Sequence, residues 1–273
     1  MSIRIALDSE IGPLETVVVH TPGSEMENMT PETAEQVLYD DILSLPLALK
    51  EHQQLTGVLN QVAHVVEFRH LLAEVLEKSH VRRALLGELC ELYGCPELIE
   101  DLLALDSRAL ARQLIEGTPK KSISLENFLS PTRYAIPPLP NAFFTRDATM
   151  CLNNRIIIGS MAYKARVAEA LLLKSVFKYH DGIDSRGFYF DGTDQPDSEV
   201  TIEGGDLLVI REDLVVIGYS ERTSVAGIDT LMRSIASQGP VRNFVVVEIP
   251  KTRATIHLDM IFTMVDRDTC VVF

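Results

Sequence analysis

Apolar and polar positions along this chain predict a strand and a helix near its start. An apolar, β-branched run from Leu14 to His20, bounded by prolines on both sides, predicts a strand followed by a turn. Thr30 followed by Pro31 is typical of a helix start, because threonine caps the first turn and proline suits its first position.

A region with helical spacing of its residues follows these first two elements. Leu, Ala, Glu and Arg recur at helical spacing from about Leu71 to Glu116, with breaks at residues 94–96 and 106–107 that divide the region into several short helices. Four prolines between Pro131 and Pro140 predict a rigid, non-helical segment. We therefore expect an inserted helical domain over residues 71–130, with residues 1–70 and 131–273 forming the other domain.

An internal repeat occupies the remainder of the chain. Each copy has a leading acid, an apolar strand, a polar turn and a second apolar strand. The leading acids are Asp147, Asp206 and Asp259. An amphipathic helix is expected after each of the first two copies, and none follows the third, which suggests a truncated piece of a longer protein. Units packed around a common axis would bring their leading acids to one end, where several carboxylates converge.

Composition narrows the class of protein. The 273 residues carry a formal net charge of -14, which argues against nucleic-acid binding because phosphate contacts need clustered Lys and Arg. No apolar stretch approaches the roughly 20 residues that cross a bilayer, so no membrane association is expected. The N-terminus lacks the features of a secretory signal, which favours the cytoplasm.

The four cysteines fit neither a disulfide framework nor a zinc pattern, and we expect buried thiols and no metal.

Three short blocks lead the three copies of the repeat and carry the candidate chemistry. They are residues 141–147, residues 203–206 and residues 257–259. Any one block alone fits a solvated turn or a core histidine, but recurrence at equivalent positions favours a shared site. The paired glycines Gly204 and Gly205 permit a close approach to the backbone that a plain turn does not require.

These residue types suit a planar cation. Asp147 and Asp259 could grip a guanidinium from two sides, because its donors form a fork that matches carboxylate geometry. His257, expected on the same strand face as Asp259, could give a proton to a leaving amine and later take one from water. Glu203 nearby would raise the pKa of His257. No nucleophile for the guanidinium carbon is evident in this set.

At these positions the sequence resembles the arginine deiminases, guanidino-modifying enzymes of the pentein or α/β-propeller fold. The resemblance covers essentially the whole chain, and it implies an incomplete α/β propeller with the helical domain inserted. The most specific matches are the blocks at residues 144–147, 203–206, 220–224 and 257–259.

The resemblance implies hydrolysis of L-arginine to L-citrulline and ammonia through an amidino-cysteine intermediate, without a cofactor. It assigns guanidinium binding to Asp147 and Asp259, acid–base catalysis to His257 and its orientation to Glu203. The matching substrate-binding positions are Asn141, Phe144, Arg166, Asp206 and Arg222. Arg166 and Arg222 also suit a substrate carboxylate, although a surface salt bridge is the alternative for each. For a full-length parent the resemblance implies a homo-oligomer.

The nucleophilic cysteine of the family lies in a C-terminal part that these 273 residues do not contain, so we expect the chain to be inactive alone. Two alternatives stay open. One is an arginine dihydrolase or another guanidino-modifying relative, which would share the Asp, Glu and His-x-Asp blocks. The other is a short, non-catalytic protein that binds arginine.

Overall fold

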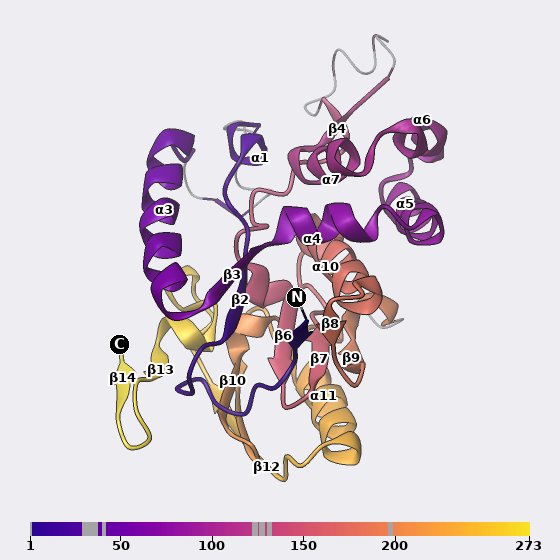
Figure 1. Cartoon of the computed structure of the whole chain (residues 1–273). Helices are drawn as coiled ribbons and strands as arrows, with labels where there is room; N and C mark the ends of the chain where they lie inside the picture. The colour runs from indigo at the N-terminus through magenta and orange to yellow at the C-terminus, as the bar shows by residue number, and fades with distance from the viewer. Residues whose placement is uncertain are drawn as a thin grey trace. The chain divides into compact units, whose positions relative to one another are not determined.

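The computed structural model of the chain describes residues 2–28, 38, 39, 42–121, 125, 129, 133–195 and 199–273. The chain divides into two compact units. Figure 1 shows their helices and strands with the labels used below. Unit 1 comprises Met1–Pro13 and Arg146–Phe273, and unit 2 comprises Leu14–Thr145. The helix start expected at Thr30 and Pro31 lies outside the described residues. The domain bounds expected from the sequence stay a prediction.

Unit 2 is mainly helical. Its helices are α1 (Ser24–Glu27), α3 (Leu45–Val62), α4 (Phe68–Val75), α5 (Ser79–Tyr93), the short η2 (Pro96–Leu98), α6 (Ile99–Ala104) and α7 (Ser107–Glu116). Strand β2 (Thr16–Val19) pairs in parallel with β3 (His64–Glu67), and β4 (Thr118–Pro119) pairs antiparallel with β5 (Tyr134–Ile136). The strand and the short helices expected from the sequence are therefore confirmed within residues 14–20 and 71–116.

The helix breaks in unit 2 have local causes. Gly94 follows α5 with φ +67°, a left-handed conformation that glycine adopts without a Cβ clash, and this ends the helix. Asp106 caps α7 by accepting hydrogen bonds from the backbone N–H groups of Arg108 and Ala109 at 3.0 and 2.9 Å. Fully buried leucines on α4, α5 and α7, such as Leu72 and Leu86, form the core under these helices.

A buried ionic cluster lies in unit 2, at the end of β2. His20 is fully buried, with Nε2 2.9 Å from Glu25 Oε1 and Nδ1 3.1 Å from Glu67 Oε1. Since both ring nitrogens face carboxylates, the imidazolium form fits this position. Burial lowers the pKa of His20, but the two carboxylates outweigh it and raise the pKa above 6.5. Burial likewise raises the pKa of Glu25 and of Glu67, yet His20 brings both below 4.5.

Unit 1 consists of small sheets and two longer helices. The order in its two three-stranded sheets is β6 (Thr149–Leu152), β7 (Arg155–Ile158), β9 (Phe188–Asp191) and β10 (Leu207–Arg211), β11 (Leu214–Tyr219), β12 (Asn243–Glu248). The two-stranded sheets are β1 (Ile3–Arg4) with β8 (Ile183–Asp184), and β13 (Phe262–Met264) with β14 (Cys270–Val272). The helices are α10 (Val167–Tyr179) and α11 (Val225–Gln238). Among the described residues no sheet closes on itself.

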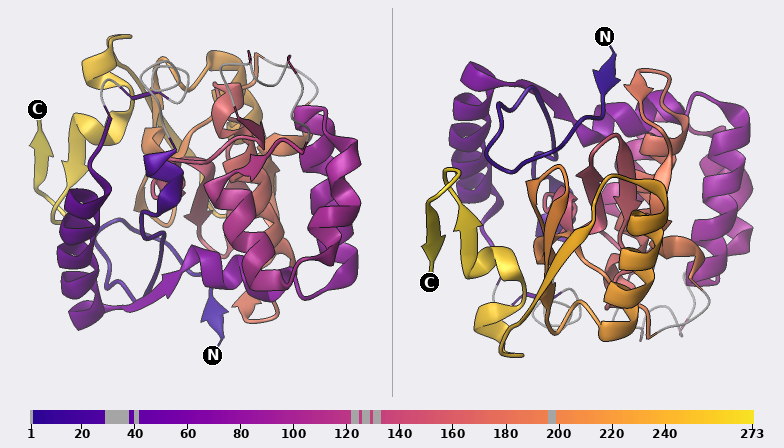
Figure 2. Two further views of the ribbon diagram at one scale, coloured as in Figure 1. Left: turned by 90° about the horizontal axis from the view of Figure 1, so that it is seen from above. Right: turned by 90° about the horizontal axis from the view of Figure 1, so that it is seen from below.

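The internal repeat expected from the sequence is confirmed as a repeated topology. In each three-stranded sheet an antiparallel hairpin is followed by a helix and then by a strand parallel to the second hairpin strand. The helices α10 and α11 lie at the two expected positions. Helix α11 buries one face, as predicted, whereas α10 is buried at every residue from Ala168 to Val176 and is not amphipathic. The third copy consists of the hairpin β13–β14, which is the yellow pair at the C-terminus in Figure 2. Apolar side chains of β6, β7, β9, β10, β11 and α11 share one buried cluster.

The thiols differ in exposure. Cys90 and Cys95 are buried and Cys151 is half-buried, whereas Cys270 is exposed on β14. The expectation of four buried thiols is therefore wrong for Cys270, because its strand is covered on neither face by another described element.

Among the described residues, none of the helices has both the length and the apolarity that a bilayer crossing needs.

The ionic cluster predicts a pH window for stability. Removing one member of a buried ion pair costs about 3–5 kcal/mol, so His20→Ala should lower the free energy of unfolding by a similar amount near pH 6. The raised pKa of His20 adds stability below pH 6.5 that fades as pH rises through that pKa. The lowered pKa values of Glu25 and Glu67 add stability above pH 4.5 that fades as pH falls. Urea unfolding across this range measures the difference, and equal loss at every pH would contradict the assignment.

The exposed hairpin predicts self-association. Val271 is 56% exposed, and among the described residues β14 pairs only with β13, which leaves an apolar strand edge for another chain. Val271→Lys should therefore reduce the concentration-dependent increase of mass in light scattering. Val225→Lys is the control, since Val225 is 57% exposed but lies at a helix start. A wild-type chain that stays monomeric at all concentrations would show that the edge is harmless.

Candidate active site

The leading acids of the repeat occupy equivalent helical turns in unit 1. Asp147 lies in α9 (Thr145–Ala148), Asp206 in η5 (Gly204–Asp206) and Asp259 in η7 (Leu258–Met260). Each turn leads directly into the first strand of a hairpin. The sequence pattern located the acids but missed these turns, because one helical turn is too short to produce a periodic signal.

Asp147, Glu203 and His257 come together in unit 1, as the sequence predicts for convergent blocks. His257 Nε2 lies 3.1 Å from Glu203 Oε2, and His257 Nδ1 lies 3.7 Å from Asp147 Oδ1. Glu203 is completely buried, His257 is 5% exposed and Asp147 is 9% exposed. A histidine is thus held between two carboxylates, away from bulk water.

Glu203 has partners for both carboxylate oxygens. Its Oε1 accepts a hydrogen bond from the backbone N–H of Ala162 at 3.0 Å. Its Oε2 faces His257, and it also lies 3.5 Å from Arg222 Nη1 and 3.8 Å from Arg166 Nη1. A buried carboxylate needs such compensation, because removing it from water is costly.

The surroundings of His257 favour its protonated form. Burial lowers the pKa of His257, but the hydrogen bond to Glu203 and the charges of Asp147, Glu203 and Asp206 outweigh burial. The pKa therefore lies above 6.5, and His257 can donate a proton at neutral pH.

The glycine pair makes room for this histidine. A Cβ atom added to Gly205 would lie 2.5 Å from His257 Nδ1, closer than real Cβ contacts allow. The close approach that the sequence suggested at these glycines is thus made by the His257 ring at Gly205 and by the backbone carbonyl of Arg146 at Gly204. The expected shared strand face of His257 and Asp259 is wrong: His257 is extended at the start of η7, and Asp259 lies inside that helical turn. The chain turns before β13 begins.

Arg166 binds two carboxylates in the structure. Its Nη1 donates to Asp147 Oδ2 at 2.6 Å, and its Nε and Nη2 donate to Glu169 Oε2 at 3.0 and 2.9 Å. Both Arg166 and Glu169 are buried. Burial raises the pKa of Glu169 to about 7, against the lowering effect of Arg166. The salt bridge considered for Arg166 therefore exists, but it is buried in the site and not on the surface.

Arg222 lies on the other side of Glu203. It is 5% exposed, and its guanidinium lies 4.5 Å from the centre of the Tyr163 ring. Arg222 Nε is buried without a hydrogen-bond partner among the described residues, which leaves a donor for a ligand. Ser220 holds this segment, since its Oγ accepts hydrogen bonds from the backbone N–H groups of Arg222 and Thr223.

Asp206 is committed to the protein itself. Its Oδ2 accepts a hydrogen bond from Ser220 Oγ at 2.6 Å, and its Oδ1 accepts one from the backbone N–H of Leu258 at 2.9 Å. It is 1% exposed. Asp206 thus ties the segment of Arg222 to the segment of His257.

The three remaining candidates are Asp259, Asn141 and Phe144. Asp259 is exposed; partial desolvation and the charges of Asp147 and Glu10 raise its pKa, against the opposing charges of His257 and Arg146. Asn141 and Phe144 belong to unit 2, where the Asn141 backbone carbonyl accepts a hydrogen bond from the Phe144 N–H at 2.9 Å. Asn141 is buried, and Phe144 is 48% exposed and contacts the Phe143 ring.

Three residues missed by the sequence interpretation support the site. Arg146 pairs with Glu10 through two hydrogen bonds of 3.1 and 2.7 Å and also donates to the Gly204 carbonyl. Glu10 in turn accepts from the backbone N–H of Val209. Glu169 is the third. Its spacing of three residues from Arg166 at a helix start was the available signal.

A metal ion could in principle use this cluster, since Asp147, Glu203 and His257 offer one ligand atom each within 4.8 Å of one another. The two arginines argue for another occupant. Arg166 already compensates Asp147 and Glu203, and Arg222 adds a second positive charge beside Glu203. The charge of a divalent cation would be repelled by both guanidinium groups.

The cysteines are not part of this cluster. Cys151 lies in β6 and Cys270 in β14, and within the described chain neither forms a hydrogen bond or ion pair with Asp147, Glu203 or His257. Burial raises the pKa of Cys151 to about 11, which disfavours the thiolate. Cys90 and Cys95 belong to unit 2, and burial raises the pKa of Cys95 to about 12.

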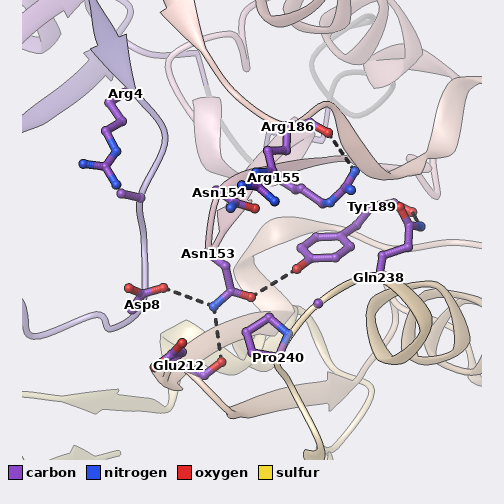
Figure 3. Close-up of a pocket in the computed structure, with 12 residues that line it drawn as sticks. Arg4, Asp8, Asn153, Asn154, Arg155, Arg186, Tyr189, Glu212, Gln238 and Pro240 are labelled. Atoms are coloured by element: carbon purple, nitrogen blue, oxygen red, sulfur yellow. Dashed lines mark hydrogen bonds between the residues drawn. The ribbon is translucent and has the colours of Figure 1, made fainter.

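A separate cavity of about 350 Å³ lies in unit 1 at the polar turns of the repeat (Figure 3). Asn153 holds one side, donating to Asp8 and to the Glu212 carbonyl while accepting from Tyr189 Oη. Arg155 reaches the Arg186 carbonyl nearby. None of the candidate residues of the acid cluster lines this cavity.

Comparisons with known proteins agree on one family. The family model described as arginine deiminase matches residues 35–273. The arginine deiminase of Pediococcus pentosaceus is 32% identical over 282 residues, spanning 97% of this chain and 68% of that protein. An arginine deiminase of Bacillus cereus is 34% identical over 285 residues, spanning 98% of this chain and 68% of that protein.

Solved structures are similar in fold. Dimethylarginine dimethylaminohydrolase of Pseudomonas aeruginosa, in complex with citrulline, has a TM-score of 0.53 at 13% identity and covers 96% of this chain and 70% of its own. An amidinotransferase of Microseira wollei has a TM-score of 0.53 at 16% identity and covers 98% of this chain and 69% of its own. The mixed α/β fold is therefore shared with these pentein structures.

The acid cluster predicts a measurable change at His257. Glu203→Gln should lower the pKa of His257 by about one pH unit or more, because burial then acts with less opposition. Histidine NMR titration measures this, and Glu212→Gln in an exposed turn is the control that should leave the pKa of His257 unchanged. An unaltered titration in Glu203→Gln would mean that Glu203 does not set the protonation of His257.

Proposed function

Because the chain belongs to the arginine deiminase family, we propose that its acid cluster binds L-arginine, the substrate that arginine deiminases hydrolyse to L-citrulline and ammonia. The observation that carries this proposal is the buried His257 between Glu203 and Asp147, at 3.1 and 3.7 Å. Carboxylates attract the guanidinium group, and a protonated histidine beside them can supply the proton that a leaving amine needs.

The roles divide along the site. Asp147 and Asp259 bind the guanidinium, His257 is the general acid and then the general base, and Glu203 orients His257. Arg166 and Arg222 face the substrate carboxylate, which is supported for Arg222 by its unpaired buried Nε among the described residues. The family resemblance assigns Asn141 and Phe144 to substrate binding, and Asp206 holds the polar network together.

The reaction needs a thiolate that attacks the guanidinium carbon. Ammonia leaves with a proton from His257. Water then attacks the carbon of the amidino-cysteine, His257 takes a proton from that water, and the C–S bond breaks to release citrulline and the cysteine thiolate. The four cysteines of this sequence do not fit that role: three are buried or half-buried, and Cys270 lies in β14. We therefore propose that residues 1–273 bind arginine without turning it over.

The fold proposal follows the same family. The hairpin–helix–strand units of unit 1 are blades of an α/β propeller, and residues 71–130 are a helical domain inserted into it. For a full-length parent, the family resemblance favours a homo-oligomer.

Two alternatives keep the same cluster. An arginine dihydrolase would release ornithine, carbon dioxide and two ammonias, another guanidino-modifying enzyme would give other products, and product analysis separates both from a deiminase. A non-catalytic arginine-binding protein would bind without turnover even in a longer natural chain. Neither has an observation in its favour that the deiminase lacks.

Calorimetry with L-arginine tests the proposal. The wild-type chain should bind L-arginine, and Asp147→Asn should weaken binding about tenfold or more, because a buried charged hydrogen bond contributes about 1.5–3 kcal/mol. Asp213→Asn, which removes an exposed arginine-paired carboxylate, is the control and should bind as the wild type does.

Turnover is checked separately with purified protein. No citrulline above background is expected. Citrulline production that His257→Ala abolishes would contradict the inactivity of residues 1–273, and absence of any arginine binding would contradict the site itself.

A further inference from the structure

The guanidinium of Arg166 is held along two different edges. The edge formed by Nε and Nη2 donates to Glu169 Oε2, while Nη1 alone reaches Asp147 and lies 3.8 Å from Glu203. The group that the proposed function assigns to the substrate's guanidinium, Asp147, is therefore occupied by a guanidinium of the protein.

We propose that Arg166 holds the place of the substrate's guanidinium at Asp147, and that Glu169 is the positioning residue that keeps Arg166 paired when the substrate takes Asp147. This proposal rests on the proposed function, since it assumes that Asp147 binds the substrate's guanidinium.

The first argument is the cost of buried charge. Asp147 is buried, and among the described residues its hydrogen-bonded cation is Arg166, while His257 lies farther away at 3.7 Å. Arg166 supplies that cation, at 2.6 Å from Asp147. When the guanidinium of a ligand without a carboxylate replaces it, Arg166 would itself be a buried cation short of a partner, because it is only 3% exposed.

Glu169 is placed to keep Arg166 paired after Arg166 leaves Asp147. It is 2% exposed and bonds the edge of Arg166 that Asp147 does not use, so its two hydrogen bonds survive the release of Asp147. Its other oxygen, Oε1, is buried with no hydrogen-bond partner among the described residues. Because Oε1 is free, Glu169 can accept hydrogen bonds from Arg166 with both carboxylate oxygens when the hydrogen bond between Arg166 and Asp147 breaks.

The position of Glu169 in the fold keeps this pair together. Arg166 is the residue before α10, and Glu169 lies in the first turn of that helix, three residues later. Side chains three apart at a helix start lie on the same face, and an acidic residue is favourable near the positive end of the helix dipole. The pair therefore moves as one piece of α10.

Calorimetry with methylguanidinium, a guanidinium without a carboxylate, tests the exchange at Asp147. At pH 8, above the pKa of about 7 of Glu169, Glu169→Gln should weaken its binding about tenfold, because the released Arg166 then has only a neutral partner. Asp229→Asn removes an arginine-paired carboxylate from the equivalent helix α11, where the pair is exposed, and should have no effect. Equal affinity in Glu169→Gln and wild type would overturn the role of Glu169 and leave the proposed function standing.

The variant Arg166→Met distinguishes two roles of Glu169: positioning Arg166, or attracting the ligand directly by its charge. If Glu169 acts through Arg166, adding Glu169→Gln to Arg166→Met should cause no further loss of methylguanidinium binding. The same tenfold loss in that background would show that Glu169 attracts the ligand by its own charge and would overturn the proposal. Failure of the wild type to bind methylguanidinium would overturn both this proposal and the guanidinium site.

NMR on the wild-type chain covers the case in which Arg166→Met does not fold. The Arg166 Nε–H signal, assigned with Arg166→Lys, should stay protected from solvent exchange both without ligand and at saturation with methylguanidinium. Protection should fall in Glu169→Gln. Protection that is absent in the free wild type, or lost at saturation, would mean that Glu169 does not retain Arg166.

Discussion

The buried carboxylate of Glu203 is the constraint on which the rest of the site depends. A carboxylate that is fully removed from water is tolerated only with partners, and Glu203 takes them from four places in the chain: Ala162, Arg166, Arg222 and His257. Each partner is thereby fixed in direction. The protonation of His257 follows from the same contact, because Glu203 opposes the effect of burial on its pKa.

The repeated topology explains how such distant residues meet. Each copy of the repeat enters its hairpin through one helical turn, and these turns carry Asp147, Asp206 and Asp259. Asp206 then binds the backbone of Leu258, which joins the second copy to the third. Gly205 leaves the space that the His257 ring fills. A scaffold of hairpins thus positions a histidine between two carboxylates without a long loop.

The sequence predicts the parts that depend on local pattern. Alternating apolar runs and polar turns located the three hairpins, and Gly94 and Asp106 marked helix ends correctly. Side-chain partners across the fold were harder. The spacing of residues in the sequence does not show that Arg166 bonds Asp147 or that Glu10 bonds Arg146. These pairings depend on which buried charges need compensation in the fold. The strand assignment of Asp259 failed for a related reason, since a single helical turn has no period.

A crystal structure of this chain with L-arginine is the most direct test of the account. The account predicts the guanidinium between Asp147 and Asp259, within hydrogen-bond distance of the Asp147 carboxylate, with Arg166 Nη1 withdrawn and Arg166 still paired to Glu169. Arginine bound in the cavity beside Asn153, with Arg166 unmoved on Asp147, would contradict it.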